Sequence, residues 1–115
     1  MVLRKLVELL ASEFEIVGQA ENGKSALECI WLQRPDVVIL DLQMPFLNGL
    51  EVTRELKKIT PIPAAVICSV QSDKETVEAA LQAGAACYVF KSCIATDLEG
   101  AVKSAARRES FVSST

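Results

Sequence analysis

Three residues of this 115-residue sequence place a chemically active side chain at the end of an apolar run. They are Asp41, Ser69 and Lys91, and the runs that they follow or end cover residues 37–40, 64–69 and 87–90. A carboxylate can act as a nucleophile, a hydroxyl can donate a hydrogen bond, and an ammonium group can neutralise an anion. From its own segment alone, Asp41 could equally cap a turn. The elements that position these side chains therefore decide between the two interpretations.

The sequence contains no histidine, which excludes Ser-His-Asp and Cys-His triads and the usual histidine-bearing zinc sites. Its four cysteines show no CxxC spacing and are interpreted as reduced, mostly buried thiols rather than as a disulfide framework. They are Cys29, Cys68, Cys87 and Cys93. The chemistry that remains uses carboxylates, lysines, hydroxyls and hard metal ions.

The composition predicts one folded domain with no membrane or nucleic-acid contact. Half of the residues are hydrophobic, and the length suits a single core. The net charge of −3 and the scattered lysines and arginines argue against a nucleic-acid surface. No apolar run reaches the roughly 18 residues that a membrane span needs, and the sequence shows no signal-peptide pattern after Met1. We therefore expect a cytoplasmic protein.

Apolar periodicity predicts helices and strands that alternate along the chain. Helices are expected over residues 2–12, 24–33 and 49–58, then from the Ser72-Asp73 cap through Ala83, and finally from Thr96, which has Glu99 three residues later. Strands are expected over residues 14–20, 37–40, 64–69 and 87–90. Residues 1–106 are assigned to the domain, and 107–115 to a polar tail that frays or begins a linker.

This alternation predicts an α/β fold with a doubly wound parallel sheet. Right-handed crossovers between parallel strands would place Asp41, Ser69 and Lys91 at one edge of that sheet. Ligands and chemistry gather at the carboxyl ends of such strands. One feature is unusual, because the chain opens with a predicted helix and such folds normally open with a strand.

With these positions fixed, the chain resembles the receiver domain of a bacterial two-component response regulator over essentially its whole length. The segments that carry the resemblance are 35–45 with Asn48-Gly49, Ser69, and 83–91. The resemblance implies a flavodoxin-like, three-layer αβα architecture. Ser92 follows Lys91 where many receivers have proline, which resembles the NarL/LuxR-like branch whose receivers precede a helix-turn-helix domain.

The resemblance also implies roles for particular residues. Asp41 would accept a phosphoryl group from a histidine kinase, Lys91 would neutralise the phosphoryl oxygens, and Ser69 would donate its hydroxyl to one of them. Tyr88 matches an aromatic switch position, although a rim aromatic with its hydroxyl in solvent fits the sequence equally well. The backbone carbonyl of Gln43 matches a magnesium ligand. Enzyme activity beyond self-phosphotransfer and autodephosphorylation is not expected.

The sequence departs from the family pattern at its start. Receivers carry a first, central strand that ends in two acidic residues, and before residue 13 this sequence has only Glu8, inside a predicted helix. Asp41 and one carbonyl supply a single carboxylate, so Mg²⁺ binding is expected to be weak and phosphotransfer impaired.

The missing strand leaves three outcomes open: the strands at 14–20 and 37–41 close up, a partner or second copy donates or exchanges a strand, or the natural protein begins upstream. If the strands close up, Glu21 would lie near Asp41 and partly replace the lost acids.

Three functional hypotheses follow. The first is a receiver that accepts phosphate on Asp41 and switches protein contacts. The second is a pseudo-receiver, an interaction module that is not phosphorylated because the acidic pair is absent. The third, a small flavodoxin-like enzyme or nucleotide binder, is disfavoured because the sequence has neither a P-loop nor a GxGxxG motif.

Overall fold

The computed structural model describes residues 14–16, 18–43 and 47–114. Helices and strands alternate as the apolar periodicity predicts, and the predicted helix 2–12 lies outside the described residues. The elements in chain order are α2 (Gly23–Gln33), β1 (Val37–Asp41), α3 (Gly49–Leu56), β2 (Ala64–Ser69), α4 (Lys74–Ala83), β3 (Cys87–Phe90), the 3₁₀ turn η1 (Lys91–Cys93), α5 (Ile94–Ala106) and β4 (Phe111–Val112).

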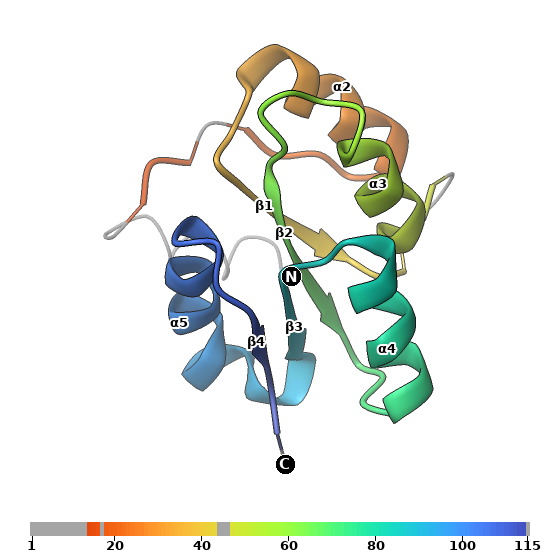
Figure 1. Ribbon diagram of the computed structural model, residues 1–115, viewed down its shortest axis with the longest axis vertical. Helices are drawn as coiled ribbons and strands as arrows, with labels where there is room; N and C mark the ends of the chain where they lie inside the picture. The colour runs from red at the N-terminus through yellow and green to blue at the C-terminus, as the bar shows by residue number, and fades with distance from the viewer. Residues whose placement is uncertain (1–13, 17, 44–46, 115) are drawn as a thin grey trace.

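The described strands form one parallel sheet in the order β1-β2-β3-β4 (Figure 1). Strand β2 lies between β1 and β3, and all six of its residues are buried. This burial explains its unbroken apolar sequence, because a strand covered on both faces has no solvent side for polar residues. The parallel register places the carboxyl ends of β1, β2 and β3 at one edge, as the sequence predicts.

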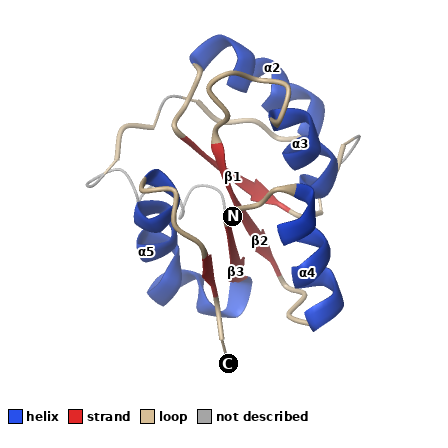
Figure 2. Ribbon diagram, viewed as in Figure 1, coloured by secondary structure: helices blue, strands red, loops and turns tan. Residues whose placement is uncertain are grey.

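Helices cover both faces of the sheet, which confirms the doubly wound α/β class (Figure 2). Side chains of α2, α3 and α4 pack on one face against alternate strand residues such as Leu40, Ile67 and Tyr88. Helix α5 packs on the other face, where Leu98 and Val102 meet Val66 and the neighbouring β3. Two separate hydrophobic clusters therefore hold the layers together.

Local capping signals explain several helix ends. Asp73 caps α4 by accepting a 3.0 Å hydrogen bond from the Thr76 backbone N–H, as the sequence predicts. The same helix ends at Gly84, whose φ of 115° is accessible to glycine and strained for other residues. Helix α3 ends at Leu56, two residues before the predicted end, because the chain turns through Lys57 and Lys58.

The predicted start of the last helix is wrong. Helix α5 begins at Ile94 instead of Thr96, because η1 already turns the chain after Lys91 and the helix continues from it. The Thr96 hydroxyl donates back to the Cys93 carbonyl at 3.1 Å and does not cap the helix. The tail also differs from expectation, since Phe111 and Val112 form β4 beside β3 instead of fraying.

The predicted strand 14–20 is also wrong, because its described residues, 14–16 and 18–20, have no strand conformation. Among the described residues β1 therefore pairs with β2 alone and forms an edge of the sheet. A hollow of about 450 Å³ lies along this edge, with lining residues from α2, from 14–16 and 18–20, and from the end of α5. The strands have not closed up, so the condition under which Glu21 would approach Asp41 is not met.

Burial in β2 yields the first prediction. We expect Val66→Ala to lower the free energy of unfolding by about 2–3 kcal/mol, because it removes two buried carbon groups and leaves a cavity between β2 and α5. The matched control Val70→Ala changes a side chain that is 72% exposed and should cost less than about 0.5 kcal/mol. Urea denaturation measures both variants, and equal losses would contradict the described burial.

Candidate functional site

Asp41 and Lys91, 50 residues apart in the chain, form an ion pair at the carboxyl edge of the sheet. Lys91 Nζ lies 2.5 Å from Asp41 Oδ2. The pair spans β2, because Asp41 ends β1 and Lys91 follows β3. The Asp41 side chain is 39% exposed and the Lys91 side chain is 26% exposed, so the carboxylate remains accessible to a reactant from solvent. The predicted meeting of these two groups is therefore seen in the structure.

The backbone after β1 orients the Asp41 carboxylate. Its second oxygen, Oδ1, accepts a 2.9 Å hydrogen bond from the Gln43 backbone N–H. The Leu42 N–H donates to the Cys68 carbonyl at 3.0 Å, which extends the pairing with β2 past Asp41. Gly49 begins α3 directly against this turn, where a Cβ atom would lie 2.7 Å from the Asp41 carbonyl oxygen. The absence of a side chain at Gly49 lets helix α3 start beside the site.

Ser69 and Tyr88 form a second group on the intervening strand and its neighbour. Ser69 is buried at the end of β2, and its hydroxyl accepts a 3.0 Å hydrogen bond from the Gln71 N–H. The Tyr88 hydroxyl donates to the Gln71 carbonyl oxygen at 2.8 Å. Burial raises the pKa of Tyr88, while its Ser69 neighbour acts in the opposite direction. The alternative of a rim tyrosine with its hydroxyl in solvent is wrong, because Tyr88 is fully buried.

Cys68 is a neighbour of the site that sequence reasoning missed. It pairs in register with Asp41 and is 2% exposed. The pKa of its thiol is raised from 9.0 to about 12, mainly by burial and also by the Asp41 charge, while the Lys91 charge acts in the opposite direction. The thiol is therefore neutral and unreactive at ordinary pH. Its apolar run predicted burial, but no local signal in the sequence indicated proximity to Asp41.

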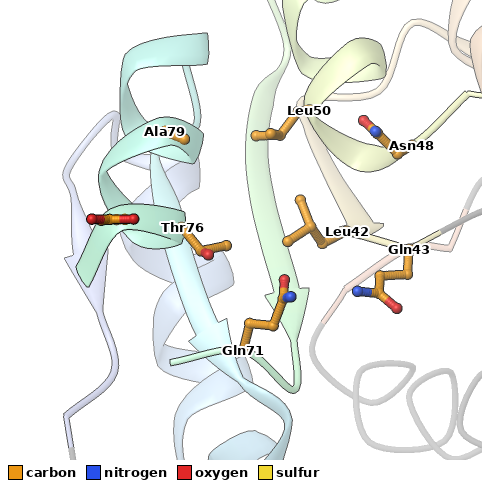
Figure 3. Close-up of a pocket in the computed structure, with 8 residues that line it drawn as sticks. Leu42, Gln43, Asn48, Leu50, Gln71, Thr76 and Ala79 are labelled. Atoms are coloured by element: carbon orange, nitrogen blue, oxygen red, sulfur yellow. The ribbon is translucent and has the colours of Figure 1, made fainter. Parts of the chain in front are cut away.

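A shallow hollow of about 400 Å³ begins at the two residues that follow Asp41 (Figure 3). Leu42 and Leu50 contribute its apolar wall, and Gln43 and Gln71 contribute amide groups. Residues of α4, including Thr76, form the opposite side. The hollow offers an approach to the carboxyl edge between α3 and α4.

The described donor groups do not fit a tight magnesium site. Mg²⁺ prefers six oxygen ligands that include one or two carboxylates. Both Asp41 oxygens already accept hydrogen bonds, one from Lys91 and one from the Gln43 N–H. Within the described ranges, no group of three or more histidine, cysteine, aspartate or glutamate residues lies together.

Comparison with known proteins agrees with this fold. The chain matches the response regulator receiver domain family over residues 1–103 and belongs to that family. It is therefore a receiver domain of the kind found in two-component systems. None of the helices in the described part of the chain is long and apolar enough to cross a membrane.

Curated relatives include transcription regulators and chemotaxis proteins. The chain is 37% identical over 111 residues to the transcriptional regulatory protein PdtaR of Mycobacterium tuberculosis, covering 94% of this chain and 53% of that protein. It is 35% identical over 78 residues to the chemotaxis protein CheY of Thermotoga maritima, covering 68% of this chain and 65% of CheY. The chain therefore spans about half the length of PdtaR and about two thirds of CheY.

Solved receiver structures share the architecture. A response regulator receiver domain protein from Clostridium thermocellum is 33% identical with a TM-score of 0.82, and the match covers 93% of this chain and 86% of that one. A DNA-binding response regulator of the LuxR family from Staphylococcus aureus is 29% identical with a TM-score of 0.85, covering 92% and 90%. The second match agrees with the branch that Ser92 indicated in the sequence.

The buried Cys68 thiol generates a pH prediction. Above pH 9 the unfolded thiol loses its proton, whereas the folded thiol keeps its proton up to a pKa of about 12. The unfolded state then binds fewer protons, so stability falls between these values by at most about 1.4 kcal/mol per pH unit from this group. We expect Cys68→Ala to make the decline of unfolding free energy between pH 9 and 11 shallower in urea titrations.

The matched control is Cys93→Ala, which replaces a half-buried thiol after Lys91. This variant should leave the slope between pH 9 and 11 as it is in the unsubstituted protein. Equal slopes for all three proteins would show that the Cys68 proton is not held by the fold.

Proposed function

We propose that Asp41 is the phosphoacceptor of this receiver and that a histidine kinase supplies the phosphoryl group. One Asp41 oxygen attacks the phosphorus atom of a phosphohistidine, the phosphorus–nitrogen bond breaks, and its electron pair returns to the imidazole, which binds a proton from solvent. The product is an acyl phosphate on Asp41. The observation that carries this proposal is the half-buried Asp41 carboxylate paired with Lys91 at the carboxyl edge.

The proposed role of Lys91 is electrostatic. A partly exposed ion pair contributes only about 0–1 kcal/mol to stability, so a stabilising role alone does not explain why Lys91 lies beside Asp41. The ammonium group instead stands where negative charge accumulates when a phosphoryl group joins Asp41. Lysine suits this position because its ammonium acts as a compact point charge that can follow the new oxygens.

Ser69 and Tyr88 are proposed to report the state of Asp41. The Ser69 hydroxyl accepts from the Gln71 N–H, so it can turn toward a phosphoryl oxygen by exchanging one hydrogen bond for another. Tyr88 bonds to the carbonyl of the same Gln71. A movement of the loop after β2 would therefore change the contacts of both side chains, and with them the surface presented to a protein partner.

The proposed partners are a histidine kinase and a transcriptional output, in line with the regulator relatives. The β1 edge leaves strand pairing with a second copy as a further proposed contact. No nucleic-acid or membrane contact is proposed for this segment, and the protein is expected in the cytoplasm. If partner binding is unchanged in Asp41→Ala, the alternative applies, namely a pseudo-receiver that binds its partner without being phosphorylated.

Acetyl phosphate tests the phosphoacceptor directly. We expect the unsubstituted protein to gain the mass of one phosphoryl group and Asp41→Asn to gain none, because the nucleophile is lost. The matched control Asp36→Asn changes an exposed aspartate just before β1 and should behave like the unsubstituted protein. Lys91→Ala should slow the reaction at least about tenfold. A phosphoryl gain that persists in Asp41→Asn would refute the assignment.

Magnesium binding is proposed to be weak, with Asp41 and the Gln43 carbonyl as its protein ligands. A single carboxylate that already pairs with Lys91 supplies little charge for the ion, so we expect a dissociation constant above about 1 mM, or a binding free energy weaker than about −4 kcal/mol. Amide NMR shifts at Gln43 during a Mg²⁺ titration measure it. Saturation at micromolar Mg²⁺ would contradict the proposed ligand set.

A further inference from the structure

The C-terminal strand β4 pairs with β3 a few residues before Lys91, at Cys87 and Tyr88. Strand β4 lies beside β3 (Figure 1). Val112 pairs in register with Tyr88, and the Ser113 N–H donates to the Tyr88 carbonyl at 2.9 Å. Phe111 packs into the cluster beneath α5. A polar tail residue thus shares a backbone hydrogen bond with the residue proposed as the switch.

The Ser113 side chain makes the attachment specific. Ser113 is 4% exposed, its hydroxyl accepts a 3.2 Å hydrogen bond from the Phe90 N–H, and it donates to Asp97 Oδ2 on α5 at 2.8 Å. A buried hydroxyl with both a donor and an acceptor satisfied fixes the groups that it joins. Here it joins the last residue of β3 to the first turns of α5.

Strand β3 is therefore held from two sides at the same point. On one side the Lys91 side chain reaches across the sheet to Asp41. On the other side the backbone N–H of Phe90, the residue before Lys91, is held by Ser113. The turn η1 begins at Lys91, directly after Phe90, so the position of the Lys91 backbone depends on both contacts.

We infer that Ser113 is a positioning residue that, by docking β4 on β3, holds Lys91 in place beside Asp41. The inference rests on the proposed function of Asp41 and Lys91. The Ser113–Phe90 hydrogen bond and the Lys91–Asp41 ion pair hold neighbouring residues of one backbone segment. Each contact stabilises the other, because a segment already held by one contact loses less conformational entropy when the second contact forms. The docked tail therefore favours phosphoryl transfer to Asp41, and the Lys91–Asp41 pair in turn favours the docked tail.

The first arm of the test measures the reaction. Ser113→Ala removes the hydroxyl that accepts the Phe90 hydrogen bond. We expect it to lower the rate of phosphoryl transfer from acetyl phosphate to Asp41 by roughly twofold to tenfold, which corresponds to the free energy of one hydrogen bond. The matched control is Ser114→Ala, which alters the adjacent exposed serine and should leave the rate unchanged. Amide hydrogen exchange at Phe90 should rise in the first variant alone.

The second arm needs no phosphoryl donor. In the unmodified protein, Lys91→Ala should raise amide exchange at Ser113 by roughly twofold to tenfold, whereas Lys74→Ala, which alters an exposed lysine of α4, should not. If Lys91→Ala leaves Ser113 exchange unchanged, the inference is overturned. A protein that takes no phosphoryl group but shows this increase retains the coupling and loses only the proposed function.

Discussion

The contact between Lys91 and Asp41 requires three parallel strands to end together. Residues so far apart in the chain meet because β1 and β3 both pair with β2 in a register that aligns their carboxyl ends. Parallel strands need crossover connections, and the described connections are helices that cover the two faces of the sheet. The layered fold is thus the condition for the site, and the weak pair itself adds little to stability.

Strand β3 connects the chemistry to the rest of the molecule. Its residues alternate between the faces, so Tyr88 lies with α4 and the loop after β2 while Val89 lies with α5. Its end carries Lys91 toward Asp41, and its backbone holds Ser113. A change at the carboxylate therefore has a short physical path to both helical layers and to the C-terminal strand.

The sequence predicted those parts of the fold whose signal is local or strongly apolar. The runs that became β1, β2 and β3 are continuous, and the Asp73 cap needs only its own turn. The strand expected at 14–20 failed because its alternation requires a neighbour to pair with, and β1 pairs with β2 alone in the described chain. Strand β4 was missed because a strand of two residues is too short to show an alternating apolar pattern. The burial of Tyr88 and Ser113 could not be predicted because it depends on segments distant in the chain.

Reductive trapping of the acyl phosphate most directly tests the central claim that Asp41 is the nucleophile of this edge. Borohydride converts a phosphorylated aspartate to homoserine, and peptide mass spectrometry then locates the converted residue. After treatment with a phosphodonor, the account predicts homoserine at position 41, and its formation at least about tenfold slower when Lys91 is replaced by alanine. Homoserine at another aspartate, or phosphate that resists reduction on a hydroxyl side chain, would contradict it.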